Sequence, residues 1–240
     1  MNKFASYQPR YNTGIVSVSW SRLKNFETCA RRYHEIDILK NFKEKPSPEL
    51  IYGNEMHDAL RYRVSHNTPL PDGFAALEKW VEFITIDSSD PNVGIQVELE
   101  LCIGKDLKPR DYKDFKEGWF RCKIDFLKLK HFPDYQLALA VDYKSGEPKP
   151  DIPQLGLMAQ AVFAHYPKVR ACKTLYIWTK VDDTTEENIY PRDMVDLWGA
   201  LNPRFQRLED AHRNGNFPPT KSGLCKAWCA VTTCEYNGKR

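Results

Sequence analysis

Residues 137–146 have the sequence LALAVDYKSG, in which small and aliphatic residues give way to an aspartate, a lysine and a Ser-Gly pair. The apolar start predicts a β-strand, and the Ser-Gly pair predicts the turn that ends it. Side chains two positions apart on a strand point to the same face of the sheet. The stretch therefore predicts that Asp142 and Lys144 project together from the end of a strand.

The preceding segment supplies a second carboxylate. Residues 124–130 (IDFLKLK) predict another strand, and a hairpin of the two strands would bring Asp125 close to Asp142 and Lys144. One or two carboxylates can hold a hard divalent cation, and a lysine can orient the attacking water or neutralise charge that develops on a phosphate. An Asp-x-Lys tripeptide alone is also typical of a solvated ion pair, so the surrounding segments decide between the two interpretations.

Several further motifs occur in a fixed order around this hairpin. A Ser-rich helix start leads to Cys29 and Arg31-Arg32-Tyr33, Gly53 precedes His57 by one helical turn, and Gln154 opens a helix after the DYKSG stretch. In this order the chain resembles the PD-(D/E)XK nuclease superfamily, in particular its RecB-like branch, which includes the CRISPR adaptation nucleases and many phage exonucleases. The resemblance runs from Ser17 to about Cys234.

Three positions depart from the family pattern. Ala30 stands where the family has a proline, Cys122 stands at a glycine position, and Met158 stands at the tyrosine of the Gln-x-x-x-Tyr motif. The last departure bears on a contact with substrate, and the metal chemistry does not depend on it.

The resemblance implies an α/β fold with a restriction-endonuclease-like core of order αβββαβ, in which a central mixed sheet is flanked by helices. The sequence patterns agree with this fold. They predict helices at 19–40, 49–65, 73–86, 151–166 and 192–214, the last with a kink at Pro203. They predict strands at 94–103, 118–130, 136–144 and 169–180. We expect one nuclease domain over residues 1–240, composed of an N-terminal extension (1–16), a helical part (17–90), the catalytic core (91–182) and a C-terminal helix with a Cys-rich segment (183–240).

The resemblance also implies the roles of the site residues. His57, Asp125, Asp142 and the backbone carbonyl of Tyr143 are expected to bind Mg²⁺ or Mn²⁺, and a histidine ligand favours manganese. Asp125, Asp142, Lys144 and Gln154 are expected to be catalytic, with Gln154 positioning the active-site strand or the DNA.

Glu98 allows two interpretations. Its carboxylate could join the metal site, but the alternation of polar and apolar residues over 96–101 favours a half-solvated strand.

The chain has seven cysteines, of which Cys225, Cys229 and Cys234 lie close together near the C-terminus. In RecB-like nucleases three such cysteines can join an N-terminal one, here Cys29, at an iron-sulfur cluster. The spacing departs from the family pattern, because the family usually has gaps of two and five residues and this chain has gaps of three and four. A [4Fe-4S] cluster, a zinc ion and no metal therefore all stay open.

The composition fits a folded globular protein, and the net charge does not by itself indicate nucleic-acid binding. The hydrophobic fraction is 42%, and the net charge is only +3. Arg31, Arg32 and Lys40 are the best candidates for contacts with the DNA backbone. No run of eighteen apolar residues and no apolar signal core are present, so we expect a cytoplasmic protein with no membrane partner.

The sequence as a whole predicts a metal-dependent DNA nuclease, an exonuclease or end-processing enzyme of recombination, repair or phage DNA metabolism. Single-stranded DNA or duplex ends are the expected substrates, and a recombination protein or a second copy of the chain is a further candidate partner. Two alternatives remain, a non-catalytic DNA-binding or inhibitor protein that retains the nuclease fold, and an enzyme that acts on RNA.

Overall fold

The computed structural model describes residues 16–149 and 151–238, which form two compact units. The first, Pro46–Gly199, is named the sheet unit, and the second, formed by the described parts of Met1–Lys45 and Ala200–Arg240, is named the helical unit. The predicted extension at 1–16 lies, apart from residue 16, outside the described residues. The prediction of a single nuclease domain stays a prediction.

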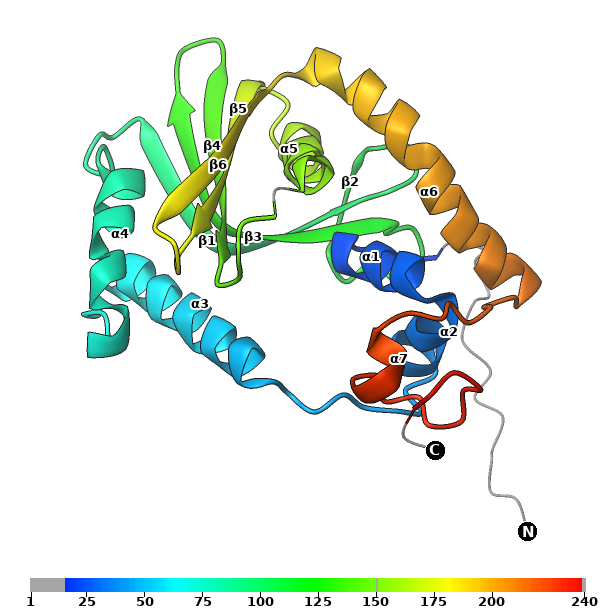
Figure 1. Cartoon of the computed structure of the whole chain (residues 1–240). Coiled ribbons are helices and arrows are strands. Elements are labelled where there is room, and N and C mark those ends of the chain that lie inside the picture. The colour runs from blue at the N-terminus through cyan, green and yellow to red at the C-terminus, as the bar shows by residue number, and fades with distance from the viewer. Residues whose placement is uncertain (1–15, 150, 239–240) are drawn as a thin grey trace. The chain divides into compact units, whose positions relative to one another are not determined.

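The sheet unit is built on a six-stranded mixed sheet with the order β2-β1-β3-β4-β5-β6 (Figure 1). Its strands are β1 (Val93–Ile103), β2 (Pro109–Arg110), β3 (Phe120–His131), β4 (Gln136–Lys144), β5 (Val169–Trp178) and β6 (Asp183–Ile189). Neighbouring strands are antiparallel except β4 and β5, which are parallel. A parallel pair needs a crossover connection, and helix α5 (Ile152–His165) supplies it.

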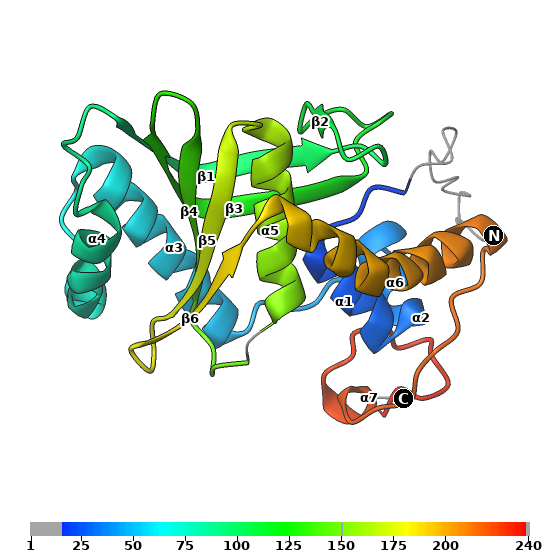
Figure 2. The ribbon, with the colours of Figure 1, turned by 90° about the horizontal axis from the view of Figure 1, so that it is seen from above.

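Helices cover both faces of this sheet, as Figures 1 and 2 show. Helix α3 (Pro48–His66), the 3₁₀ helix η2 (Asp72–Leu77) and helix α4 (Glu78–Thr85) pack on the face from which Val141 and Tyr143 project. Side chains alternate between faces along a strand, so Asp142 projects to the other side, where Gln154 of α5 meets it. Strand β4 is therefore covered by α3 on one face and by α5 on the other.

Helix α5 is buried on all sides over residues 155–162. A Cβ atom at Gly156 would lie 2.7 Å from Leu197 Cδ1, so only glycine allows the first part of α6 (Met194–Asn214) to pack this closely. The one buried polar side chain in the stretch, Gln160, accepts a hydrogen bond from Trp198 Nε1 at 3.0 Å. This close packing fixes the position of α5 against the sheet.

The predicted core order αβββαβ is confirmed, with two strands that the sequence patterns missed. Strand β6 has the sequence DTTEENI and was assigned to the C-terminal helical part, because its mostly polar residues show little apolar alternation. An edge strand such as β6 can be this polar, since only one side of it pairs with the sheet. The second, β2, is a two-residue edge strand.

The helical unit contains α1 (Trp20–Thr28), α2 (Ala30–Tyr33), the π-helix η1 (His34–Ile38), the second part of α6 and α7 (Leu224–Ala227). The single helix predicted at 19–40 is wrong, because Cys29 has extended backbone angles (φ −165°, ψ 111°) that end α1. The Cys29 thiol then accepts the Arg32 backbone N–H at 3.5 Å and caps α2. The break places the Cys29 thiol at the N-terminus of α2.

Two contacts between distant parts of the sequence hold the helical unit together. Arg204 of α6 donates two hydrogen bonds to the Glu27 carboxylate at 2.7 and 2.6 Å. The Tyr33 hydroxyl lies 2.8 Å from His212 Nε2, beside the ring of Phe217.

Within the described part of the chain, no helix has the length and apolar character that crossing a bilayer requires.

We predict that acid destabilises the protein through His212. Burial lowers the pKa of this imidazole to about 4, and the nearby His34 and Arg22 add to the effect. The unfolded chain binds the proton below its usual pKa of about 6.5 while the folded chain does not, so stability falls as the pH falls from about 6.5 to 4. The loss should be about 2 kcal/mol, or roughly 5 °C in the unfolding temperature.

The variant His212→Gln provides the control, because glutamine offers Tyr33 a partner but does not titrate. Thermal unfolding measured from about pH 7 to 4 should fall less steeply for this variant than for the wild type. Parallel curves for the two proteins would show that His212 does not contribute.

Candidate functional site

The candidate site lies where strands β3 and β4 stop pairing. Their ladder ends at Phe126 and Val141, after which β3 continues beside β1 and β4 continues beside β5. Asp125 is the first β3 residue past the last pair, and its Oδ2 accepts the Tyr143 backbone N–H at 2.7 Å. The Asp125 carboxylate thus accepts a hydrogen bond that a backbone carbonyl would accept if the two strands stayed paired. The point where β3 and β4 stop pairing is named the fork.

His57 of α3 faces the fork from the helix side. Its Nδ1 lies 3.3 Å from Asp125 Oδ1, and its ring contacts the Tyr143 ring edge-on at a centroid distance of 6.0 Å. The two oxygens of Asp125 therefore have different neighbours, one a backbone N–H and the other an imidazole.

The glycine one turn before His57 has a steric role. A Cβ atom at Gly53 would lie 2.9 Å from Ser145 Oγ, in the turn that follows β4. Glycine therefore lets α3 approach this turn closely, and the helical repeat places His57 on the same face of α3 as Gly53. The Gly-x-x-x-His spacing in the sequence corresponds to this contact.

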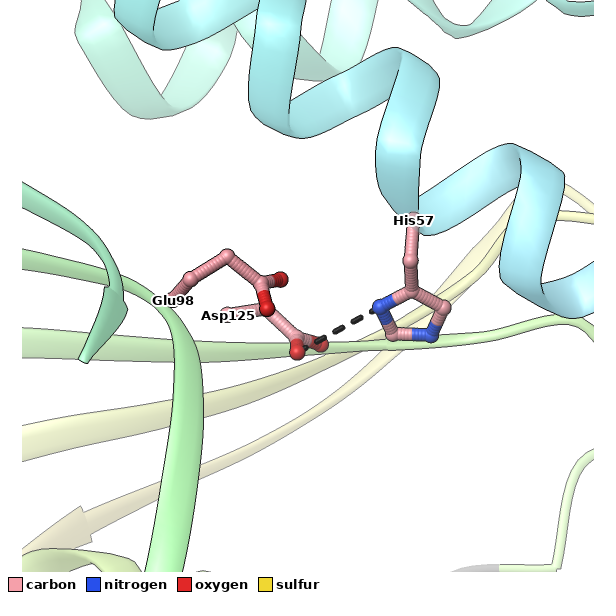
Figure 3. Close-up of side chains that lie close together, drawn as sticks. All are labelled: His57, Glu98 and Asp125. Atoms are coloured by element: carbon pink, nitrogen blue, oxygen red, sulfur yellow. Dashed lines mark ion pairs between the residues drawn. The ribbon is translucent and has the colours of Figure 1, made fainter. Parts of the chain in front are cut away.

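Glu98 of β1 joins His57 and Asp125 at the fork (Figure 3). One ligand atom from each of the three residues lies within 4.8 Å of the others, and among the described residues no other set of histidine, cysteine or acidic side chains meets this distance. The Glu98 backbone has a φ of 53°, in the left-handed region, which costs about 1–2 kcal/mol for a residue other than glycine. Lys123 forms an ion pair with the same carboxylate.

Both interpretations of Glu98 agree with part of the structure. Residues 93–99 of β1 are half-buried, as expected for a half-solvated strand, and the Glu98 side chain is 20% exposed. Its carboxylate nevertheless lies beside His57 and Asp125. The left-handed backbone at Glu98 is a feature for which polar and apolar alternation carries no signal.

Asp142, Lys144 and Gln154 form a second cluster on the α5 face. Lys144 Nζ lies 2.6 Å from Asp142 Oδ2, and Gln154 Nε2 donates to Asp142 Oδ1 at 3.3 Å. Lys144 Nζ also donates to Gln154 Oε1 at 3.4 Å. The predicted proximity of Asp142 and Lys144 is thus observed, and both oxygens of Asp142 have a nitrogen partner.

Burial and charge shift the pKa values of two groups at the fork. Burial raises the pKa of Asp142 to about 6, the charge of Asp125 adds to this effect, and Lys144 and His57 oppose it. Burial alone would lower the pKa of His57, but the hydrogen bond and charge of Asp125, with the charges of Asp142 and Glu98, outweigh it and raise the value. Both groups therefore bind protons at a higher pH than usual.

The four cysteines predicted to form a cluster lie together in the helical unit. Cys29, Cys225, Cys229 and Cys234 line one small cavity. The Thr220 N–H donates to Cys29 Sγ at 3.4 Å, and the Ser222 N–H donates to Cys225 Sγ at 3.4 Å. Such donors are typical of thiolates that bind a metal, because they stabilise the negative sulfur.

The three basic residues predicted to contact DNA also belong to the helical unit. Arg32 donates to both oxygens of Glu44 at 2.6 Å, and Arg31 lies 3.6 Å from Glu235. Both arginines line the cysteine cavity. Lys40 is exposed and has a φ of 57°. Their contact with DNA stays a prediction.

Comparisons with known proteins agree with this fold. A model of the PD-(D/E)XK nuclease superfamily matches residues 17–237, whereas a search of curated proteins finds no match. Among solved structures, a proposed exonuclease from Eubacterium rectale is 12% identical, with a TM-score of 0.48 over 94% of this chain and 91% of that chain. The protein SSO0001 is 13% identical, with a TM-score of 0.41 over 91% and 85%. The family model spans most of the sequence, and this chain therefore belongs to the PD-(D/E)XK nuclease superfamily.

Proposed function

We propose that the protein is a divalent-metal-dependent DNA nuclease that hydrolyses phosphodiester bonds at the fork. The observation that carries the proposal is the approach of His57, Glu98 and Asp125 to within 4.8 Å of one another in a chain of a nuclease superfamily. Asp142 and Lys144 lie on the adjoining strand at a distance of 2.6 Å. The complete set of ligands and a lysine favours an enzyme over a DNA-binding or inhibitor protein that has lost catalysis.

The donor set fits Mn²⁺ or Mg²⁺. Carboxylate oxygens suit both ions, and an imidazole favours Mn²⁺. His57, Asp125 and Asp142 would hold the ion, and Glu98 adds a third carboxylate. The Tyr143 carbonyl is a further candidate, because a residue's C=O and N–H point to the same side of a strand, and this N–H points to Asp125. When bound, such an ion polarises the phosphate and lowers the pKa of its water.

The residues of the chain supply the remaining requirements. Lys144 carries the positive charge that orients the nucleophilic water or neutralises charge on the phosphate. Asp142 keeps Lys144 in place at 2.6 Å, and Gln154 holds the other oxygen of Asp142. The site is only partly exposed, with Lys144 29% and His57 32% accessible, so phosphate reaches it from one side.

The substrate is proposed to be single-stranded DNA or a duplex end, processed in recombination, repair or phage DNA metabolism. Arg31, Arg32 and Lys40 are proposed to contact its phosphates, and a recombination protein or a second copy of the chain is the proposed partner. Contacts with phosphates carry no sequence information, so these residues would bind DNA of any sequence.

We further propose that the four cysteines hold a [4Fe-4S] cluster, with zinc as the alternative. The four cysteines line one small cavity, and four thiolates can hold either group. The N–H donors to Cys29 and Cys225 support either metal group.

The first prediction concerns catalysis. The purified protein should cleave DNA with Mn²⁺ or Mg²⁺, and Asp142→Asn and Lys144→Ala should each lower the rate at least about 100-fold, because each removes charge needed in the transition state. Cleavage of linear but not circular DNA would identify an exonuclease, and a parallel RNA substrate separates DNase from RNase activity.

The matched control is Lys173→Ala. Lys173 forms a 2.6 Å ion pair with Glu186 on β5 and β6, so this variant removes an equally short pair from the same unit. It should retain the wild-type rate. If the wild type cleaves nothing with either ion, or if both site variants cleave as fast as the wild type, the catalytic assignment is refuted.

The second prediction concerns protons and metal. The pKa of Asp142 is raised to about 6, and that of His57 is raised above its usual value, so protons compete with the ion at both groups as the pH falls from neutral. Mn²⁺ should raise the unfolding temperature at about pH 7.5, and its apparent affinity should fall about tenfold per pH unit for each group that becomes protonated. His57→Gln should show weaker binding with a shallower pH dependence. Equal stabilisation by Mn²⁺ at about pH 5 and 7.5 would contradict this account.

The third prediction concerns the cysteines. Protein purified without oxygen should be coloured, lose its visible absorbance on reduction and contain about four iron atoms per chain. Cys225→Ser should lose the iron, whereas Cys172→Ala, which alters a buried cysteine of β5, should keep it. About one zinc per chain would establish the alternative, and protein without iron or zinc would exclude both metal groups.

A further inference from the structure

Tyr176 of β5 lies directly beside the catalytic strand. It is the ladder partner of Asp142 and is fully buried. Its hydroxyl oxygen lies 2.9 Å from Gln154 Oε1 and 3.1 Å from the Asp151 carbonyl oxygen. Lys144 Nζ lies 4.9 Å from the centroid of its ring. One side chain thus contacts both a residue that holds Asp142 and the lysine of the site.

The direction of these hydrogen bonds fixes the Gln154 amide. The Lys144 ammonium can only donate, so it selects the oxygen end of the amide. The Tyr176 hydroxyl has a single proton and donates it to this same oxygen at 2.9 Å, which is closer than the Asp151 carbonyl oxygen at 3.1 Å. The NH₂ end then faces Asp142 Oδ1 at 3.3 Å and donates to it. A reversed amide would set its oxygen against the Asp142 carboxylate and its NH₂ group against the ammonium.

The ring of Tyr176 has a separate effect on Lys144. A cation over the face of an aromatic ring is attracted by the negative charge of that face, and more strongly where water is excluded. The ring of Tyr176 therefore attracts the ammonium at 4.9 Å from its centroid, while Asp142 pairs with it at 2.6 Å.

We propose that Tyr176 is a positioning residue of the nuclease site, whose hydroxyl sets the orientation of the Gln154 amide and whose ring supports Lys144. This inference rests on the proposed nuclease function and adds to it a residue outside the sequence motifs. Tyr176 acts through Gln154 and Lys144, because its hydroxyl contacts Gln154 Oε1 and the Asp151 carbonyl and its ring contacts Lys144.

The test is a double-mutant cycle measured as DNA cleavage by the full chain with Mn²⁺. Tyr176→Phe, which removes only the hydroxyl, should lower kcat about tenfold with KM for DNA unchanged, equivalent to about 1.4 kcal/mol. Gln154→Met, which keeps the shape but lacks the amide, should give a similar loss. The combined variant should lose no more than either single variant, because the hydroxyl acts through the amide.

The matched control is Tyr166→Phe. The Tyr166 hydroxyl also bonds a glutamine amide in the sheet unit, Gln96 at 2.9 Å, but it lies outside the site. This variant should keep the wild-type kcat, and its unfolding temperature measures the cost of losing a Tyr–Gln hydrogen bond.

The possible results separate the inference from the function on which it rests. Cleavage by Tyr176→Phe at the wild-type rate, or losses that add fully in the combined variant, would overturn the inference and leave the nuclease function standing. A KM effect without a kcat effect would also overturn it. A wild type that cleaves nothing would overturn both.

Discussion

The hydrogen bond from the Tyr143 N–H to the Asp125 carboxylate is the interaction on which the site depends. Two strands that part would leave a buried backbone donor without a partner, at a cost of about 1–3 kcal/mol. Asp125 removes this cost with a charged acceptor at 2.7 Å. Strands β3 and β4 can then stop pairing at this point, where α3 packs on one face of the sheet and α5 on the other. His57 and Gln154 reach the same place from these two helices.

Asp125 and Asp142 differ in their properties because they have different neighbours. Asp142 is held between a lysine and an amide, and burial raises its pKa to about 6. Asp125 faces a backbone N–H and an imidazole, whose proton affinity it increases. Asp125 and Asp142 lie on adjacent strands, and they have different partners because their surroundings differ.

The period of two along a strand was enough to predict that Asp142 and Lys144 lie together, and the turn signal after them gave the end of β4. The Gly53–His57 spacing and the start of α5 just after Asp151 also followed from local patterns. The left-handed φ of Glu98, the extended residue Cys29 and the contacts of Tyr176 did not. Each depends on residues distant in sequence, and composition in a short window does not encode such contacts. The polar β6 was missed because an edge strand needs few apolar residues.

The two oxygens of the Asp125 carboxylate have different partners. Oδ2 accepts the backbone N–H of the neighbouring strand, and Oδ1 lies 3.3 Å from the His57 imidazole. A carboxylate oxygen that accepts one hydrogen bond retains a second lone pair. This side chain could therefore bind a cation or a further donor while its hydrogen bond to the backbone of β4 stays intact.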